Sequence, residues 1–165
     1  MNRLSGASGI ASPIQWMDDW LLGHDGMDAC HKEFATLLAH LQSADDEDLV
    51  SVFDRFIKHL REHFDAEDVM MLRTNFPPRQ CHMDEHAAVM KSVFEVRQQL
   101  AAGNRPLVRR LANELAAWFP AHTQYLDSAL AHWVNKTRLG GKTLVLKRGV
   151  ASSLEPPRDR GGRLV

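Results

Sequence analysis

The sequence has few cysteines, no long apolar run and almost no net charge. Its two cysteines, Cys30 and Cys81, form no CxxC pair, which excludes a disulfide scaffold and favours reduced thiols in a cytoplasmic protein. No run of roughly 18 apolar residues is present, so no membrane-spanning helix is predicted. The formal net charge of −1 gives no reason to expect nucleic acid or an anionic membrane as a partner of the whole chain.

The first 16 residues, MNRLSGASGIASPIQW, contain no continuous apolar stretch of signal-peptide length. We therefore expect the protein to stay in the cytoplasm. The 165 residues are 44% hydrophobic and 25% charged, which is typical of one globular domain. We predict an N-terminal arm over 1–15, a helical domain over 16–137 and a flexible basic tail over 138–165.

Apolar residues recur at helical spacing in four segments. The first covers about 24–42, and the second starts at the acidic cluster after Ser43, where carboxylates complement the helix dipole, and runs to about 74. The third covers about 80–102, and the fourth begins near Pro106 and continues to about 136. Four helices with short connections indicate an all-α fold, an antiparallel up-down-up-down four-helix bundle. The run KTLVLK at 142–147 could form a strand, but the chain shows no strand to pair with it.

Histidines and carboxylates lie on the apolar stripes of these helices. Residues four apart on a helix point to the same side, and such spacing relates His63 to Glu67 and His82 to His86. The remaining candidates are His31 on the first helix, with His122 and Asp127 on the fourth. Buried polar groups need partners, and imidazole and carboxylate are ligands for first-row transition metals. We therefore predict a metal site inside the bundle.

Each of these signals has an ordinary structural explanation when it is taken alone. A single inward histidine is usually a hydrogen-bonded core residue, and the pair His63 and Glu67 could be a surface ion pair. The complete set is more specific, because five histidines and two carboxylates exceed the needs of one tetrahedral zinc ion and suit two ions bridged by carboxylates. Diiron bundles of the ferritin type use Glu-x-x-His, which this chain lacks. A nitrogen-rich site is better suited to holding and releasing a ligand than to oxidising a substrate.

The order and spacing of these residues resemble those of the hemerythrins, in particular the single-domain bacterial members. The resemblance covers about 16–136 and rests on four segments: WMDDWLLGHDGMDACHKEF, HFDAED, HMDEH and WFPAHTQYLD. It implies a non-haem diiron centre in which two iron ions share a bridging oxo or hydroxo group. By position, one iron would be bound by His82, His86 and His122, and the second, open iron by His31 and His63, while Glu67 and Asp127 would bridge the two.

The same resemblance implies reversible binding of molecular oxygen, for carriage, storage, delivery or sensing, and not an enzyme. An oxygen-consuming enzyme would be a natural partner, and a monomer is favoured. The alternatives are a diiron enzyme that handles peroxide or nitric oxide, a protein that binds iron or another metal for a different purpose, and a purely structural bundle. The tail is too short for a signalling output domain, although it could dock on an acidic partner or a membrane surface.

Two residues could adapt this site in the present chain. Pro120 is predicted to kink the fourth helix, and we hypothesise that the kink turns His122 and Asp127 inward together, because a five-residue spacing rotates their directions apart. His59, one turn before His63, is either a hydrogen-bonding group near the open iron, a substitute ligand or an inert residue. We expect no part in the site for the other polar and aromatic candidates: His24, His40, His132, Cys30, Cys81, Asp68 and Trp118.

Overall fold

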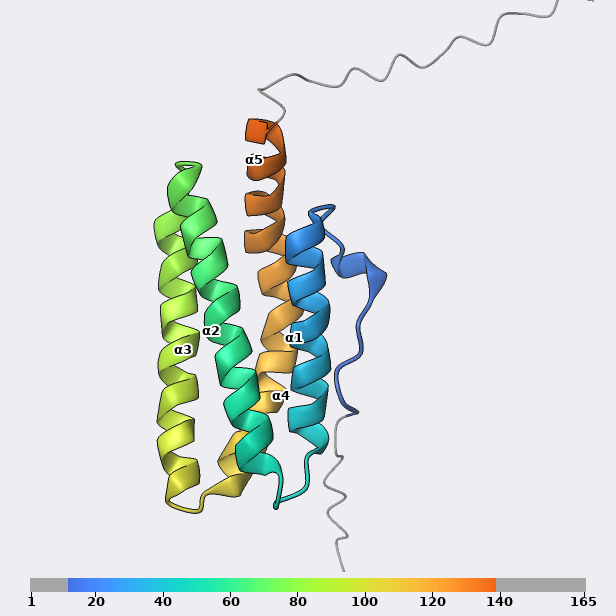
Figure 1. Ribbon diagram of the computed structural model, residues 1–165, viewed down its shortest axis with the longest axis vertical. Coiled ribbons are helices and arrows are strands. Elements are labelled where there is room, and N and C mark those ends of the chain that lie inside the picture. Colours follow the sequence, from blue (N-terminus) through green and yellow to red (C-terminus); the bar gives the residue numbers. More distant parts are fainter. Residues whose placement is uncertain (1–11, 139–165) are drawn as a thin grey trace, which may run out of the picture.

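A computed structural model describes residues 12–138. Three single helices, α1 (Asp25–Ser43), α2 (Leu49–Arg73) and α3 (Arg79–Ala101), form the first three rods of the bundle. The fourth rod is continuous but composite: α4 (Arg105–His122) is followed by the π-helical turn η2 (Thr123–Asp127) and by α5 (Ser128–Arg138). Figure 1 shows that the chain reverses direction from each rod to the next. The predicted all-α four-helix bundle is therefore confirmed.

The acidic cluster was predicted to lie in the first turn of the second helix, but it lies before α2. Ser43 is the last residue of α1, and its hydroxyl donates to the carbonyl of Ala39 at 2.9 Å. In the turn that follows, Asp46 accepts a hydrogen bond from Arg109 of α4 at 2.8 Å. Asp46 therefore serves a contact between rods rather than the start of a helix.

The segment before α1 packs along the bundle. The backbone N–H of Ile14 donates to the Gln42 side chain at 2.7 Å, and a short 3-10 helix, η1 (Asp18–Trp20), follows. Trp20 is buried, and its ring meets Phe119 edge-on with the centroids 5.4 Å apart. The described residues do not include the rest of the predicted arm (1–11) or the predicted tail beyond Arg138, with its run at 142–147. The boundaries proposed for the arm, the helical domain and the tail stay predictions.

The apolar core consists of two clusters at different heights in the bundle. The larger cluster contains Phe34 of α1, Phe64 of α2 and Phe119 of α4. The smaller cluster contains, among others, Met27 of α1, Met71 of α2 and Leu130 of α5. Each of these three rods thus passes from one cluster to the other, and the segments between the clusters carry four of the predicted metal ligands, His31, Glu67, His122 and Asp127.

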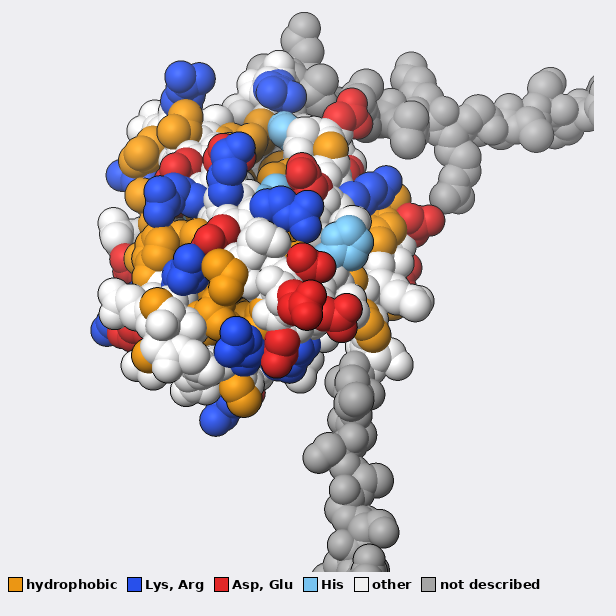
Figure 2. Space-filling model, turned by 60° about the horizontal axis from the view of Figure 1, so that its bottom comes forward, with side chains coloured by type: hydrophobic (Ala, Val, Ile, Leu, Met, Phe, Trp, Pro, Cys, Tyr) orange, Lys and Arg blue, Asp and Glu red, His pale blue; other side chains and the backbone are white. Residues whose placement is uncertain are grey.

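The surface differs in character from this interior. On the face in Figure 2, basic and acidic side chains are interspersed and little histidine surface is visible, because seven of the nine histidines are buried: His24, His31, His59, His63, His82, His86 and His122. Among residues 12–138, no helix combines the length and apolarity needed to cross a bilayer.

Candidate metal centre

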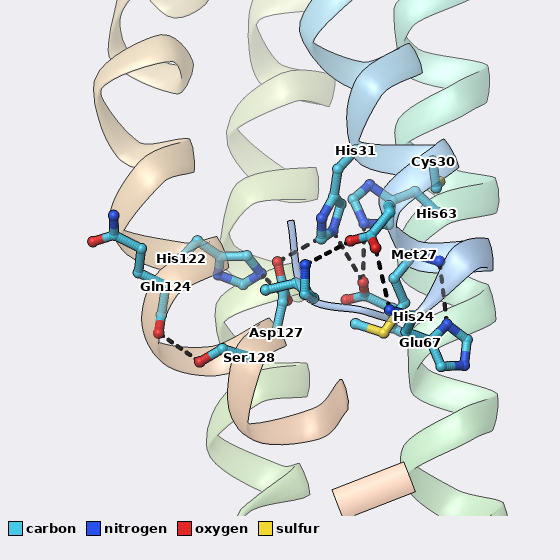
Figure 3. A network of polar contacts seen from close by, with 12 residues as sticks. His24, Met27, Cys30, His31, His63, Glu67, His122, Gln124, Asp127 and Ser128 are labelled. Carbon is cyan, nitrogen blue, oxygen red and sulfur yellow. Dashed lines mark hydrogen bonds and ion pairs between the residues drawn. The ribbon is translucent and has the colours of Figure 1, made fainter. Parts of the chain in front are cut away.

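All four rods contribute to one buried polar cluster between the two apolar clusters. The seven predicted ligands are each at most 3% exposed. Figure 3 shows side chains from α1, α2 and the fourth rod pointing toward one another. The complete set comprises His31 on α1, His63 and Glu67 on α2, His82 and His86 on α3, His122 at the end of α4, and Asp127 at the end of η2.

The π-helical turn explains how His122 and Asp127 reach the same interior space. Five residues make more than one turn of an α-helix, so regular geometry would rotate the two side chains apart. In η2 the helix widens, and the N–H of Ser128 donates to the carbonyl of Thr123, five residues earlier. The two side chains consequently approach each other, with His122 Nε2 3.2 Å from Asp127 Oδ1. Pro120 lies in the last turn of α4, directly before this widening.

Three imidazoles meet on one side of the cluster. His122 Nε2 lies 3.3 Å from His82 Nε2 and 3.3 Å from His86 Nε2. Two nitrogens bound at right angles to one ion at about 2.0–2.1 Å would lie roughly 3 Å apart. The observed spacing is therefore close to that of three ligands on one face of a single metal ion.

Carboxylates outside this group determine which ring nitrogens carry protons. His86 donates through Nδ1 to Asp68 at 3.0 Å, and His122 donates through Nδ1 to Glu85 at 3.0 Å. In the neutral imidazoles the Nε2 lone pairs of His86 and His122 then face each other, an arrangement that a cation between them would stabilise. Glu85 also accepts a hydrogen bond from Trp118 at 2.7 Å, which fixes its position.

The second group lies on the opposite side of the two buried carboxylates. His63 Nε2 is 3.1 Å and His31 Nε2 is 3.5 Å from Glu67 Oε1. The other oxygen of Glu67 faces the three-histidine group, 3.4 Å from His86 Nε2. Asp127 is divided in the same way, with Oδ2 3.3 Å from His31 and Oδ1 toward the first group. Each carboxylate therefore directs one oxygen to each group.

Several of these buried atoms have no hydrogen-bond partner. They are Glu67 Oε2, both carboxylate oxygens of Asp127 and Nε2 of His31. An unsatisfied buried polar group costs about 1–3 kcal/mol, and more when it is charged. Two cations placed between imidazole nitrogens and carboxylate oxygens would satisfy them all. The residues present therefore fit a pair of first-row transition-metal ions.

The charge state of the carboxylates agrees with a cation site. Burial alone would raise the pKa of Glu67, but the imidazoles of His31 and His63, which face its carboxylate, outweigh it and hold that pKa well below its usual range. For Asp127, burial and the charge of Glu67 raise the pKa, and the imidazoles of His122 and His82, which face its carboxylate, lower it by more. Both groups are therefore ionised at neutral pH.

Two residues near the cluster have roles that the sequence analysis missed. Asp68 was expected to have no part in the site, yet its side chain is only 28% exposed and accepts a hydrogen bond from His86. Glu85 was not singled out, although it binds both His122 and Trp118. A carboxylate next to a ligand in the sequence is a weak signal, because its partner comes from another helix.

The remaining histidines differ in environment. His24 is buried, and its Nδ1 accepts a hydrogen bond from the Met27 N–H at the start of α1. His40 and His132 are exposed. His59 is 8% exposed, and burial together with the neighbouring His63 lowers its pKa.

Comparisons with known proteins identify the family of the chain. Residues 22–134 match the family model described as the Hemerythrin HHE cation binding domain. The chain is 40% identical over 121 residues to a bacteriohemerythrin of Ralstonia nicotianae, covering 73% of this chain and 88% of the relative. Bacteriohemerythrins of Stenotrophomonas maltophilia and Aquifex aeolicus are each 28% identical, over 73% and 67% of this chain and 81% and 88% of those relatives. No solved structure matches the chain. The family match and the 40% identity show that the chain belongs to the hemerythrin family, among its bacterial members.

Proposed function

We propose that this protein binds two iron ions in the buried cluster and uses them to bind molecular oxygen reversibly. The observation that carries the proposal is the unequal division of the imidazoles. Three face one side of the carboxylate pair and two face the other. An ion on the two-histidine side would have fewer protein ligands, which leaves a position for a small external ligand.

Each of the seven side chains has a distinct part in this proposal. His82, His86 and His122 would hold one iron, and His31 and His63 would hold the other. Glu67 and Asp127 would bridge the ions, because each directs one oxygen to each side. The iron pair, with an oxo or hydroxo bridge, would supply the redox-active chemistry for reversible oxygen binding.

The surroundings of the cluster support binding and release rather than turnover of a larger substrate. Phe119 lies against His31 with ring centroids 5.5 Å apart, and Phe34 stacks on Phe119 at 4.4 Å. Phe64 stacks on the His86 ring at 3.9 Å. Phe119 and Phe34 thus form an apolar wall on the two-histidine side, and Phe64 forms one on the three-histidine side. We therefore propose a carrier, store, donor or sensor of oxygen, not an enzyme, with an oxygen-consuming enzyme as the natural recipient.

The decisive experiment combines metal analysis with absorption spectroscopy in the presence and absence of oxygen. We expect two irons per chain and a colour change that reverses when oxygen is removed. The variant His63→Ala should lose the change, whereas His132→Ala, which alters an exposed histidine, should keep it. A single zinc ion, or no metal, would contradict the iron pair. An irreversible change, or steady consumption of peroxide or nitric oxide, would favour an enzyme instead.

A further inference from the structure

A second group of metal-ligand side chains lies where α1 and α2 pack together, beside the proposed iron centre. Cys30, His59 and His63 each bring one ligand atom to within 4.8 Å of the other two. Figure 3 shows Cys30 next to the His63 ring. The iron-centre assignment uses only His63 from this group and gives no role to Cys30 or His59.

A carboxylate favours the tautomer of His59 that a metal ligand needs. His59 Nδ1 lies 3.5 Å from Glu33 Oε2, and His59 Nε2 lies 3.9 Å from Cys30 Sγ. With its proton on Nδ1, toward Glu33, the ring presents the Nε2 lone pair to the sulfur. Histidine ligands of metals usually have a carboxylate on their second nitrogen; His86 and His122 donate hydrogen bonds to theirs at 3.0 Å, and the longer approach of His59 to Glu33 is an electrostatic contact of the same sense.

The distance between nitrogen and sulfur suits an ion between them. Bond lengths of about 2.3 Å to sulfur and 2.0–2.1 Å to nitrogen place the two ligand atoms roughly 3.5 Å apart at a tetrahedral angle and about 4.3 Å apart when linear. The observed 3.9 Å lies between these limits. For a hydrogen bond from a thiol, in contrast, 3.9 Å is long.

The third side chain has a nitrogen to spare, and the group can be reached from solvent. His63 faces Glu67 through Nε2, while its Nδ1 is buried without a hydrogen-bond partner. Cys30 is partly exposed, so that an ion can enter at the sulfur, whereas His59 and His63 are 8% and 3% exposed.

We infer that Cys30, His59 and His63 form a separate binding site for a thiophilic cation of the zinc class. Thiolate and imidazole together select such ions over the hard cations that prefer oxygen ligands. The site shares the His63 ring with the proposed iron centre, so an ion bound at Nδ1 would displace the proton there and leave an imidazolate between the two sites. It would also displace the thiol proton of Cys30, whose pKa burial raises to about 12. If the proposed function holds, an ion at Cys30 should also alter the spectrum of the oxygenated protein.

The test uses the iron-loaded full-length protein and Cd²⁺, whose bond to a thiolate produces a charge-transfer absorption in the ultraviolet. We expect one Cd²⁺ per chain to bind, with this absorption and without loss of iron. Cys30→Ser should abolish the absorption and weaken binding at least about tenfold, and His59→Gln should also weaken it. Cys81→Ser is the matched control, because Cys81 also directly precedes a histidine of the iron centre but is exposed, and it should behave as the unmodified protein.

A second measurement needs no substitution. Zn²⁺ should slow the alkylation of Cys30 by iodoacetamide, followed by mass spectrometry, and leave the rate at Cys81 unchanged. The inference is overturned if Cys30→Ser binds Cd²⁺ with undiminished affinity, if binding disappears in Cys81→Ser, if it releases iron in equal amount, or if Zn²⁺ does not protect Cys30. None of these readouts depends on oxygen binding, so failure here is distinguishable from failure of the proposed function.

Discussion

At the scale of single residues, the orientation of a ligand depends on the group behind it. The Nδ1 of His122 donates to Glu85, and Trp118 donates to the same carboxylate oxygen. Both hydrogen bonds lower the pKa of Glu85 by more than burial raises it. An ionised carboxylate in this place holds the ring of His122 in position and increases the basicity of its Nε2.

Removing that carboxylate should therefore weaken metal binding without unfolding the protein. We expect Glu85→Ala to lower the affinity for iron by about 10–100-fold, measured as the iron retained during dialysis against a chelator. Glu114→Ala is the control, since Glu114 is an exposed carboxylate on α4 that only approaches Arg110. Equal iron retention in the two variants would show that Glu85 does not orient His122.

The buried carboxylates also predict how the metal-free protein responds to acid. The pKa of Glu67 lies well below its usual value of 4.5 in the folded state, and that of Asp127 lies below 3.8. Their contribution to stability is complete above these usual values and is lost as the pH falls through the lower folded-state values. Urea unfolding of the metal-free protein should therefore show a free energy that falls from pH 5 to pH 3. In Glu67→Gln the fall should be smaller, and an identical slope would contradict this origin.

At the scale of elements, the π-helical turn adds one residue to the fourth rod without rotating α5. Tyr125 lies in this turn and is 74% exposed, so it adds little to the core. Without it, a regular α-helix would separate His122 and Asp127 by four residues and still align them. The turn thus matters because it sets the rotation of Asp127 and α5 relative to α4. The particular side chains on its outer surface matter little.

This argument predicts opposite effects for removing and adding one residue. Deletion of Tyr125 should leave the helical content and the iron stoichiometry nearly unchanged. Insertion of one alanine after Tyr125 should rotate Asp127 and α5 by roughly 100° relative to α4 and abolish iron binding. Circular dichroism and metal analysis would test both variants, and equal iron content in the two would refute the argument. Pro120→Ala tests separately whether proline is needed for the turn; unchanged iron content and oxygen affinity would exclude that role.

At the scale of the whole molecule, the buried polar cluster separates two apolar cores and joins all four rods. Metal ions bound there would stabilise the folded state. When the free iron concentration exceeds the dissociation constant about 100-fold, iron binding raises the free energy of unfolding by about 2.7 kcal/mol. For a chain of this size each kcal/mol corresponds to roughly 2–4 °C in Tm.

Removal of the metal should therefore lower Tm by roughly 5–10 °C, measured by calorimetry before and after chelation. Anaerobic addition of Fe²⁺ should restore the original value. An unchanged Tm would mean that the cluster does not hold the bundle together through bound ions.

The sequence was sufficient for the architecture and for the residues that gather in the interior. Helical periodicity predicted four helices with ends close to those observed, because the Pro77-Pro78 pair and Gly103 stop helices locally; Gly103 has a φ of +90°. The seven buried side chains were predicted because their spacing placed them on apolar stripes. Such signals lie within one helix and need no knowledge of its neighbours.

Only the tertiary structure decided which groups support that cluster. Asp68 and Glu85 bind histidines on other helices, His59 faces Glu33 and Cys30 across the seam between α1 and α2, and His24 is buried. The widened turn between His122 and Asp127 also emerged only in three dimensions. The physical reason is that the sequence determines the face of a helix on which a side chain lies, whereas its partner and its protonation depend on the helices packed against that face.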